Sequence, residues 1–437
     1  MLKKEVKIVR PIVVDHIARI EGKAGIEVVM REDGKAVARV NVIEGPRFFE
    51  SIVRGKHVNE AVTVLSRICS FCSAAHKLTA VMCAEKALGI EVSEQVAKLR
   101  ELLYLANHIE SHSLHLFFLV FPDLLGYHDV IEMGKDYPDV LSAALKLKEV
   151  SARVQDIIGS RFIHAENVIP GGFSKLPSRE KLKEIAREYE EIEKLAEIPM
   201  EILMSFEYPD YLDRDRIHIA VKPYGEEYTV IGKDIETNDN DTFNPENYKD
   251  VLKEKVVSHS FAKHVFYKGK RFMTGAISRY TIFKNLMIGK AREKAVLRSS
   301  LLDPRNPFSN NFAQAVELMY FIDKSKRLAE ELAESIKDER PATPSKRSGN
   351  AIVCTEAPRG TLIYSMKIKN GTVVDADIIT PTAMFLALME EDIRIAAEHM
   401  WKDGEKNAEE ISRKLQMLVR AYDPCISCSV HICHVRE

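Results

Sequence analysis

The sequence lacks a long apolar run. Its longest apolar stretch, residues 114–121, falls far short of the roughly 20 residues that a membrane-spanning helix needs. The first residues, MLKKEVKIVR, carry charge and lack the apolar core of a secretion signal. We therefore expect a cytoplasmic protein without a membrane span.

The chain also lacks an excess of charge of one sign and the common nucleotide-binding loops. Its formal net charge of -2 offers no basic excess to a polyanion, so we do not expect a nucleic-acid partner. Neither a G-x-G-x-x-G fingerprint nor a Walker-type loop occurs, so a nicotinamide cofactor is expected to bind elsewhere. Beyond two Cys-x-x-Cys pairs, no further cluster of about four cysteines is present for an iron–sulfur centre.

The composition of the 437 residues is that of an ordinary globular protein, 46% hydrophobic and 29% charged. We expect an α+β fold that is predominantly α, with a core of long helices and small peripheral β-hairpins. Hairpins are predicted at residues 25–45 around Asp33-Gly34 and at 362–379 around Asn370-Gly371. Strand character is predicted over 216–232 and a loop over 339–350. Helices are predicted over residues 59–70, 73–88, 94–120, 139–158, 179–206, 283–300, 311–337, 382–400 and 407–421.

The two Cys-x-x-Cys pairs lie near opposite ends of the chain. They are Cys69–Cys72 in RICSFCSAAH and Cys425–Cys428 in DPCISCSVH. Four thiolates together select soft or borderline metals such as Zn, Cu(I), Fe and Ni. A site that joins them closes only when the C-terminal part docks, so both ends are expected in one intertwined domain.

Simpler interpretations of the pairs remain open on spacing alone. A structural zinc ribbon joins its two pairs through about 15–20 residues, whereas most of this chain separates them. A dithiol redox motif leaves the second pair unexplained. Covalent haem needs histidine where Ser73 and Ser429 stand. The lone Cys83 and Cys354 are expected in the core, because free cysteine packs as a small apolar group.

The residues around the pairs favour one family. RICSFCSAAH and DPCISCSVH resemble the two signature motifs of the NiFe hydrogenase large subunit, and so do DHIARIEG, GPRFFE, TEAPRG and IITPT, further stretches that follow one another along the chain in the expected order. The resemblance covers about residues 11–431. SFCSAAHK is most similar to the cytoplasmic, NADP-linked sulfhydrogenase branch. The metal-free relative of this fold, a quinone-binding subunit of respiratory complexes, lacks the thiol pairs.

The resemblance implies a nickel–iron centre. All four sulfurs would bind nickel, with Cys69 and Cys425 as terminal ligands, while Cys72 and Cys428 would also bridge to iron. The iron would carry one carbon monoxide and two cyanides. Heterolytic splitting of H2 would then combine metal-ion catalysis with a terminal thiolate that accepts the proton. The competing function is a zinc-stabilised structural subunit without hydrogen chemistry.

Three charged residues acquire roles from the resemblance. Glu21 in RIEG would be the first proton relay from the thiolate, although by itself it reads as an ion-paired carboxylate. Arg359 in TEAPRG would hang above the metals, where its charge is fixed. Asp423 would orient that arginine; its simpler interpretation is an Asp-Pro turn residue.

Further residues complete the implied site. His76 resembles a hydrogen-bond donor to a bridging sulfur, which would tune its basicity. Pro358 and Pro381 would wall the pocket. A smaller site for Mg, or Fe, would have three protein ligands: Glu50, the backbone carbonyl of Ile378 and His431.

A helical row of histidines is less specific. His108, His112 and His115 share one face of the predicted helix. Buried, hydrogen-bonded core histidines are favoured over a second metal or a proton chain. Many members of the family have aspartate in this stretch, where the chain has Ser111.

The resemblance also implies partners and processing. A maturation endopeptidase would remove the tail 432–437, leaving a single domain over 1–431. Because the chain has no electron exit of its own, a small subunit with iron–sulfur clusters is expected at a large interface near the first thiol pair, and diaphorase subunits with FAD and further clusters beyond it. The final electron acceptor would be NADP, or sulfur or polysulfide.

Overall fold

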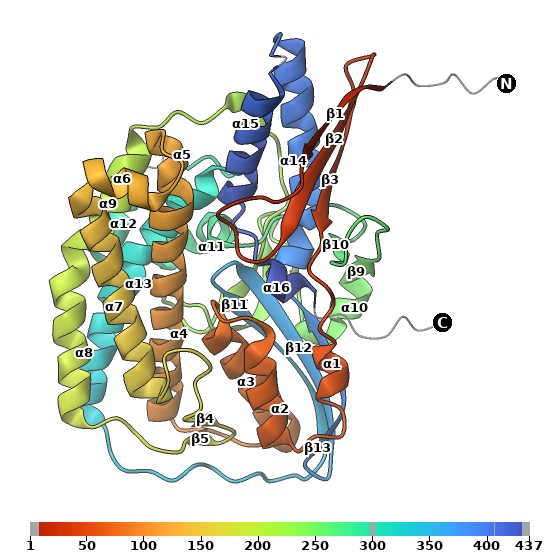
Figure 1. Ribbon diagram of the computed structural model, residues 1–437. Coiled ribbons are helices and arrows are strands. Elements are labelled where there is room, and N and C mark those ends of the chain that lie inside the picture. Colours follow the sequence, from red (N-terminus) through yellow and green to blue (C-terminus); the bar gives the residue numbers. More distant parts are fainter. Residues whose placement is uncertain (1–7, 298–301, 406, 431–437) are drawn as a thin grey trace.

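The computed structural model describes residues 8–297, 302–405 and 407–430. Long helices packed side by side form one half of the molecule (Figure 1). They are α4 (Glu94–Leu114), α7 (Pro138–Gly159), α8 (Arg179–Ile192) and α13 (Ser309–Ser335). α8 shows why they pack, because its buried side chains recur at helical spacing from Leu182 to Ile192 and form one apolar face. Serine side chains cap α4 and α8 at Ser93 and Ser178.

Antiparallel sheets lie beside the long helices (Figure 1). The N-terminal sheet contains β1 (Ile8–Val14), β2 (Ala24–Arg31) and β3 (Ala36–Val42). The largest sheet is a C-terminal meander of β11 (Gly349–Ala357), β12 (Gly360–Lys369) and β13 (Thr372–Ile379). Smaller sheets contain β4 (Val168–Ile169) with β5 (Gly172–Phe173), β6 (Ile219–Pro223) with β7 (Gly232–Thr237) and β8 (Thr242–Phe243), and β9 (Leu252–Lys255) with β10 (His264–Tyr267). The fold is thus α+β with a helical core, as predicted.

The remaining helices connect these layers. They are α1 (Phe49–Ile52), α2 (Val58–Leu65), α3 (Ser73–Leu88), α5 (Phe121–Leu125), α6 (Val130–Asp136), α9 (Ile198–Met204), α10 (Tyr248–Val251), α11 (Ala276–Phe283), α12 (Gly289–Leu297), α14 (Pro381–Lys402), α15 (Ala408–Ala421) and α16 (Ile426–Ser429). In the described part of the chain, no single helix is long and apolar enough to cross a membrane; 94–125 and 130–136 reach that length and composition only as a pair bent by 70°.

The first and last parts of the chain interlock. α3 packs on β11 and β12, and α14 packs against β3 (Figure 1). The backbone of Glu21 forms a parallel bridge with Cys425, and Ile426 N donates to Glu21 O at 3.1 Å. Because hydrogen bonds join the two ends directly, the site between them depends on segments that are about 400 residues apart in sequence.

Most predicted helices and both hairpin turns are confirmed, but several boundaries were wrong. The helix predicted over 179–206 is broken into α8, a 3-10 turn and α9, because Pro199 can be accommodated only at a helix start. The strand predicted over 216–232 is an end of β7 and all of β6, separated by a loop. The helix from 94 continues through a π-helical segment into α5. The helix predicted over 283–300 begins with a 3-10 turn, and its last residues lie outside the described ranges.

Candidate active site

The two thiol pairs meet in one buried cluster. Cys69 follows a short 3-10 turn, Cys72 directly precedes α3, and Cys425 and Cys428 belong to the turn that forms α16. The Sγ atoms of Cys69 and Cys425 lie 3.2 Å apart. Those of Cys72 and Cys428 lie 3.0 Å apart, and all four sulfur atoms lie within 4.8 Å of one another. No disulfide is recorded for the cysteines of the described ranges.

The cluster fits a metal, because four buried thiols this close together can lose their protons only beside a cation. Burial and the neighbouring thiols hold the pKa of Cys425 well above its ordinary value. The pKa of Cys428 is also well raised, mainly by burial. Burial would raise the pKa of Cys69 too, but hydrogen bonds from the other thiols lower it. Four thiolates at this spacing therefore require a cation, and four soft sulfur donors suit nickel and iron.

Glu21 contacts this cluster from the N-terminal side. Its Oε2 lies 3.1 Å from Cys425 Sγ and accepts from the backbone N–H of Ser427 at 2.9 Å. Burial, followed by the charge of Cys69, raises the pKa of Glu21 above its ordinary value. A carboxyl with a raised pKa that touches one thiol can exchange a proton with it.

Arg359 and Asp423 form a buried ion pair beside the thiols. Arg359 Nε donates to Asp423 Oδ1 at 3.0 Å, and Nη1 donates to Ser111 Oγ at 3.2 Å. The guanidinium lies 5.8 Å from the centre of the Phe71 ring, which stands between the first two cysteines. Burial alone would raise the pKa of Asp423, but Arg359 and His115 hold it below its ordinary value. The charge near the sulfurs is therefore fixed in position.

The two predicted wall residues occupy turns next to the cluster. Pro358 lies in the tight connection between β11 and β12, directly before Arg359. Pro381 is the first residue of α14. The next residue, Thr382, accepts the backbone N–H of Cys425 with its hydroxyl at 2.9 Å. The start of α14 therefore supports the second thiol pair.

His76 lies against the second thiol pair. Its Nε2 is 3.4 Å from Cys428 Sγ, and its Nδ1 is 2.6 Å from the hydroxyl of Tyr364. With the proton on Nε2, the ring donates to the sulfur while Tyr364 donates to Nδ1. Both partners fix the orientation of the imidazole.

Glu50 and Ile378 also lie together. The Ile378 backbone N–H donates to Glu50 Oε1 at 2.7 Å. Both residues line a small cavity shared with Glu254 and Lys263. His431 lies outside the described residues, so the third member of the predicted smaller metal site has no position here.

The helical histidines are all buried in α4 and the π-helical segment that follows it. His112 Nε2 is 2.7 Å from Glu317, and His115 lies 2.6 Å from the Arg420 carbonyl. His108 Nδ1 lies 2.9 Å from the carbonyl of Tyr104, and burial lowers the pKa of His108 to about 3. This is the environment expected of core histidines.

Several positioning contacts were not predicted. Arg47 donates to the carbonyls of Ile68 and Ser427 and so joins the two thiol segments. Its signal was its place in the GPRFFE motif. Gln314, near the start of α13, donates to Asp423 Oδ2 at 2.9 Å. A polar residue among buried neighbours in a predicted helix was the available signal for Gln314.

Comparison with known proteins agrees with this geometry. The family model described as nickel-dependent hydrogenase matches residues 47–143 and 213–431. The chain is 46% identical over 422 residues to sulfhydrogenase 1 subunit alpha of Pyrococcus furiosus, covering 97% of this chain and 98% of that one. It is 35% identical over 417 residues to sulfhydrogenase 2 subunit alpha of the same organism, covering 95% and 98%.

Solved structures show the same fold. The structure of an NAD+-reducing NiFe hydrogenase in the H2-reduced state superposes with a TM-score of 0.89 at 21% identity, covering 97% of this chain and all of that one. A Ni-Fe-Se hydrogenase from D. vulgaris Hildenborough gives 0.77 at 21% identity, with 97% and 100% covered. Fold and thiol cluster together define a metal-dependent oxidoreductase. The chain belongs to the nickel-dependent hydrogenase family and is the large, catalytic subunit of a hydrogenase.

Proposed function

We propose that this subunit splits H2 reversibly in a cytoplasmic complex that passes the electrons to NADP, or to sulfur or polysulfide. The convergence of four buried thiols with Glu21 in contact with Cys425 is the observation that carries the proposal. When bound, a nickel–iron centre with one carbon monoxide and two cyanides on iron would supply the two-electron chemistry. Cys69 and Cys425 would be its terminal ligands, and Cys72 and Cys428 would bridge its metals.

A route for the proton leads from the thiols toward the surface. Glu21 contacts Cys425 Sγ directly, so it accepts the proton that leaves this sulfur. The hydroxyl of Ser427 lies 3.2 Å from Glu44, a partly exposed carboxylate. The backbone N–H of Ser427 donates to Glu21 Oε2 at 2.9 Å. Ser427 thus contacts Glu21 through its N–H and Glu44 through its hydroxyl. A hydroxyl placed between two carboxylates can give its proton to one while it takes a proton from the other.

The side chains around the thiol cluster set its electrostatic environment. Arg359 presents a permanent positive charge beside the sulfurs, and hydrogen bonds to Asp423 and Ser111 fix its guanidinium in place. His76 tunes a bridging sulfur by its hydrogen bond to Cys428. Pro358 and Pro381 wall the pocket without adding donors of their own.

The second, smaller metal site would lock the C-terminal segment. Glu50 and the Ile378 carbonyl would bind Mg, or Fe, together with His431. Residues 1–431 would form one intertwined domain, and an endopeptidase would remove 432–437 after metal insertion. The interlocked backbone of Glu21 and Ile426 supports this order, because the thiol pairs have to receive metal before the C-terminal segment closes over them.

The electrons require a partner. We propose a small subunit with iron–sulfur clusters, and flavin and iron–sulfur subunits beyond it. Both sulfhydrogenase relatives are named alpha subunits, which supports an assembly of several chains. Large exposed apolar side chains lie in the segment that Arg47 ties to both thiol pairs: Ile43, Phe48 and Ile52. Phe71, between the first two cysteines, is also exposed. A permanent complex of roughly 2,000 Å2 or more would cover this surface.

Placing a charge on this surface should separate the subunits. We expect Ile52→Asp to weaken binding of the small subunit by about 30-fold or more, because an unpaired charge at an interface core costs on the order of 2 kcal/mol. Co-purification and titration with the small subunit measure this. Ile131→Asp in α6 is the control, because it places the same charge on an exposed isoleucine outside this surface; Ile131 is 73% exposed and Ile52 46%. Equal binding by the two variants would place the partner elsewhere.

The function is tested on the assembled complex. We expect nickel and iron in equal amounts, infrared bands of carbon monoxide and cyanide, and H2-dependent reduction of NADP. Reduction of polysulfide but not NADP would assign the other acceptor. A lone zinc ion with no H2-dependent reduction would instead support the structural subunit and overturn the proposal.

A further inference from the structure

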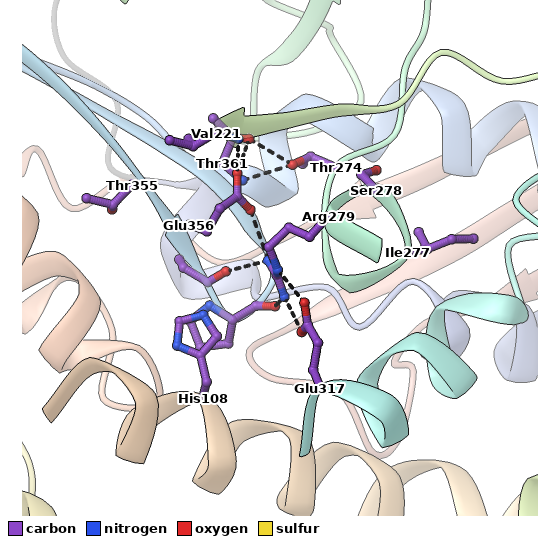
Figure 2. A network of polar contacts seen from close by, with 12 residues as sticks. His108, Val221, Thr274, Ile277, Ser278, Arg279, Glu317, Thr355, Glu356 and Thr361 are labelled. Carbon is purple, nitrogen blue, oxygen red and sulfur yellow. Dashed lines mark hydrogen bonds and ion pairs between the residues drawn. The ribbon is translucent and has the colours of Figure 1, made fainter. Parts of the chain in front are cut away.

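One arginine outside the thiol site, Arg279, donates hydrogen bonds to the turn that contains Arg359. Arg279 lies in α11 and is 1% exposed. Its guanidinium points at the end of β11, where it meets two carboxylates and two backbone carbonyls (Figure 2). Nη1 donates to the Ala357 carbonyl at 3.0 Å, and Nη2 donates to the Pro358 carbonyl at 3.1 Å.

Two carboxylates hold Arg279 in this orientation. Glu317 of α13 accepts from Nε and Nη2, each at 2.7 Å. Glu356 of β11 accepts from Nη1 at 2.9 Å. All five N–H groups of a guanidinium are therefore engaged, and a lysine ammonium, with three donors, cannot reproduce the set.

The carboxylates are themselves fixed. Glu317 accepts hydrogen bonds from Tyr228 and from His112, which lies 2.7 Å away. Glu356 Oε1 accepts from the Val221 backbone at 2.8 Å and from the Thr361 hydroxyl at 2.7 Å (Figure 2). Burial would raise the pKa of Glu317, but Arg279 and His112 hold it far below its ordinary value, so this carboxyl stays charged.

The turn between β11 and β12 has little conformational freedom. It contains only Pro358 and Arg359 between the two strands, and Gly360 follows with φ 131°. A side chain at Gly360 would collide with Thr274, whose atoms lie 2.5 Å from the position of a Cβ. Arg359 is thus held at both ends, its backbone through Arg279 and its guanidinium through Asp423.

We propose that Arg279 is a positioning residue that sets the place of the Arg359 guanidinium over the four thiols by fixing the carbonyls of Ala357 and Pro358. The inference rests on the role proposed above for Arg359. A hydrogen-bond set that occupies every donor of Arg279 transmits small changes in its position directly to the turn, because the interior around it is close-packed.

The test is Arg279→Lys in the assembled, metal-loaded complex. We expect a loss of turnover of about tenfold or more with unchanged nickel and iron content, little change in KM for H2, and shifted infrared bands of the diatomic iron ligands. Arg100→Lys is the matched control. Arg100 is a buried arginine with a bidentate pair to Glu85 and a carbonyl contact to Ile169, away from the thiols. It should lower the melting temperature comparably but leave turnover and infrared bands unchanged.

Two further variants make every outcome decisive. If Arg279→Lys does not assemble, Glu356→Gln replaces it, because the amide keeps the shape but presents N–H groups or a weaker acceptor to Arg279. The inference is overturned if the variant that assembles matches Arg100→Lys in turnover and infrared bands. Arg359→Lys is measured in parallel: full activity there would refute the proposed role of Arg359, whereas an impaired Arg359→Lys with a normal Arg279→Lys would refute the positioning role alone.

Discussion

Replacing Cys425 by serine should lower hydrogen-dependent activity to below about 1% of the wild type and remove nickel from the protein. A serine hydroxyl is not deprotonated at neutral pH and is a hard ligand, whereas the proposed nickel site consists of soft thiolates. Loss of outer partners of metal ligands already costs about 10- to 100-fold, so loss of a ligand should cost more. Metal analysis and H2-dependent dye reduction on the purified complex measure both effects.

The chain supplies a control for this substitution. Cys83 is buried in α3 and donates to the carbonyl of Ala351 at 3.3 Å, outside the thiol cluster. Burial raises the pKa of Cys83 to about 12, so it stays a neutral thiol. Cys83→Ala should keep its nickel and most of its activity. A Cys425→Ser protein with a full nickel content would contradict the assignment of the four-sulfur site.

Replacing Glu21 by glutamine should slow turnover by about 100- to 10,000-fold while nickel and iron are retained. Glutamine keeps the shape and can still accept from the Ser427 backbone, but it cannot carry a proton away from Cys425. Because the proposed ligands of the metals are sulfur atoms, the infrared bands of the proposed carbon monoxide and cyanide ligands should persist. H2 oxidation and exchange of H2 with deuterated water should both slow.

A second buried carboxyl serves as the comparison for Glu21. Burial raises the pKa of Glu110 to about 7, and Gln155 donates to its Oε2 at 2.7 Å. Glu110→Gln therefore changes a carboxyl of similar environment in α4 without touching the thiols, and turnover should stay within about twofold of the wild type. Wild-type exchange rates in Glu21→Gln would exclude this residue from the proton route.

Local structure was largely predictable. The helices over 73–88 and 382–400 were predicted within about two residues, because helical periodicity is encoded in adjacent turns. β1 and β11 were not predicted. Each strand gains its stability from pairing with β2 or β12, and such pairing depends on tertiary context more than on the sequence of the strand.

Part of the site could also be expected before its geometry was known. TEAPRG pointed to Arg359, and the Cys-x-x-Cys pairs pointed to a soft-metal site. Nothing local linked Arg279 to the same turn, because it lies about 80 residues earlier in a different helix. Gln314 and Tyr364 likewise acquire their contacts only when α13 and β12 are brought to the C-terminal segment.

Residue types and motif order were enough to establish the hydrogenase family, the soft-metal chemistry and the absence of a recognisable nucleotide-binding loop. Ligand preference follows from side-chain chemistry, which each residue carries with it wherever it stands. Distances, burial and the partners of each charge came from the folded chain alone. Examples are the hydrogen bond from Ile426 to Glu21 and the one from Arg279 to the Pro358 carbonyl. Such contacts between distant segments exist only once the packing that buries them has formed.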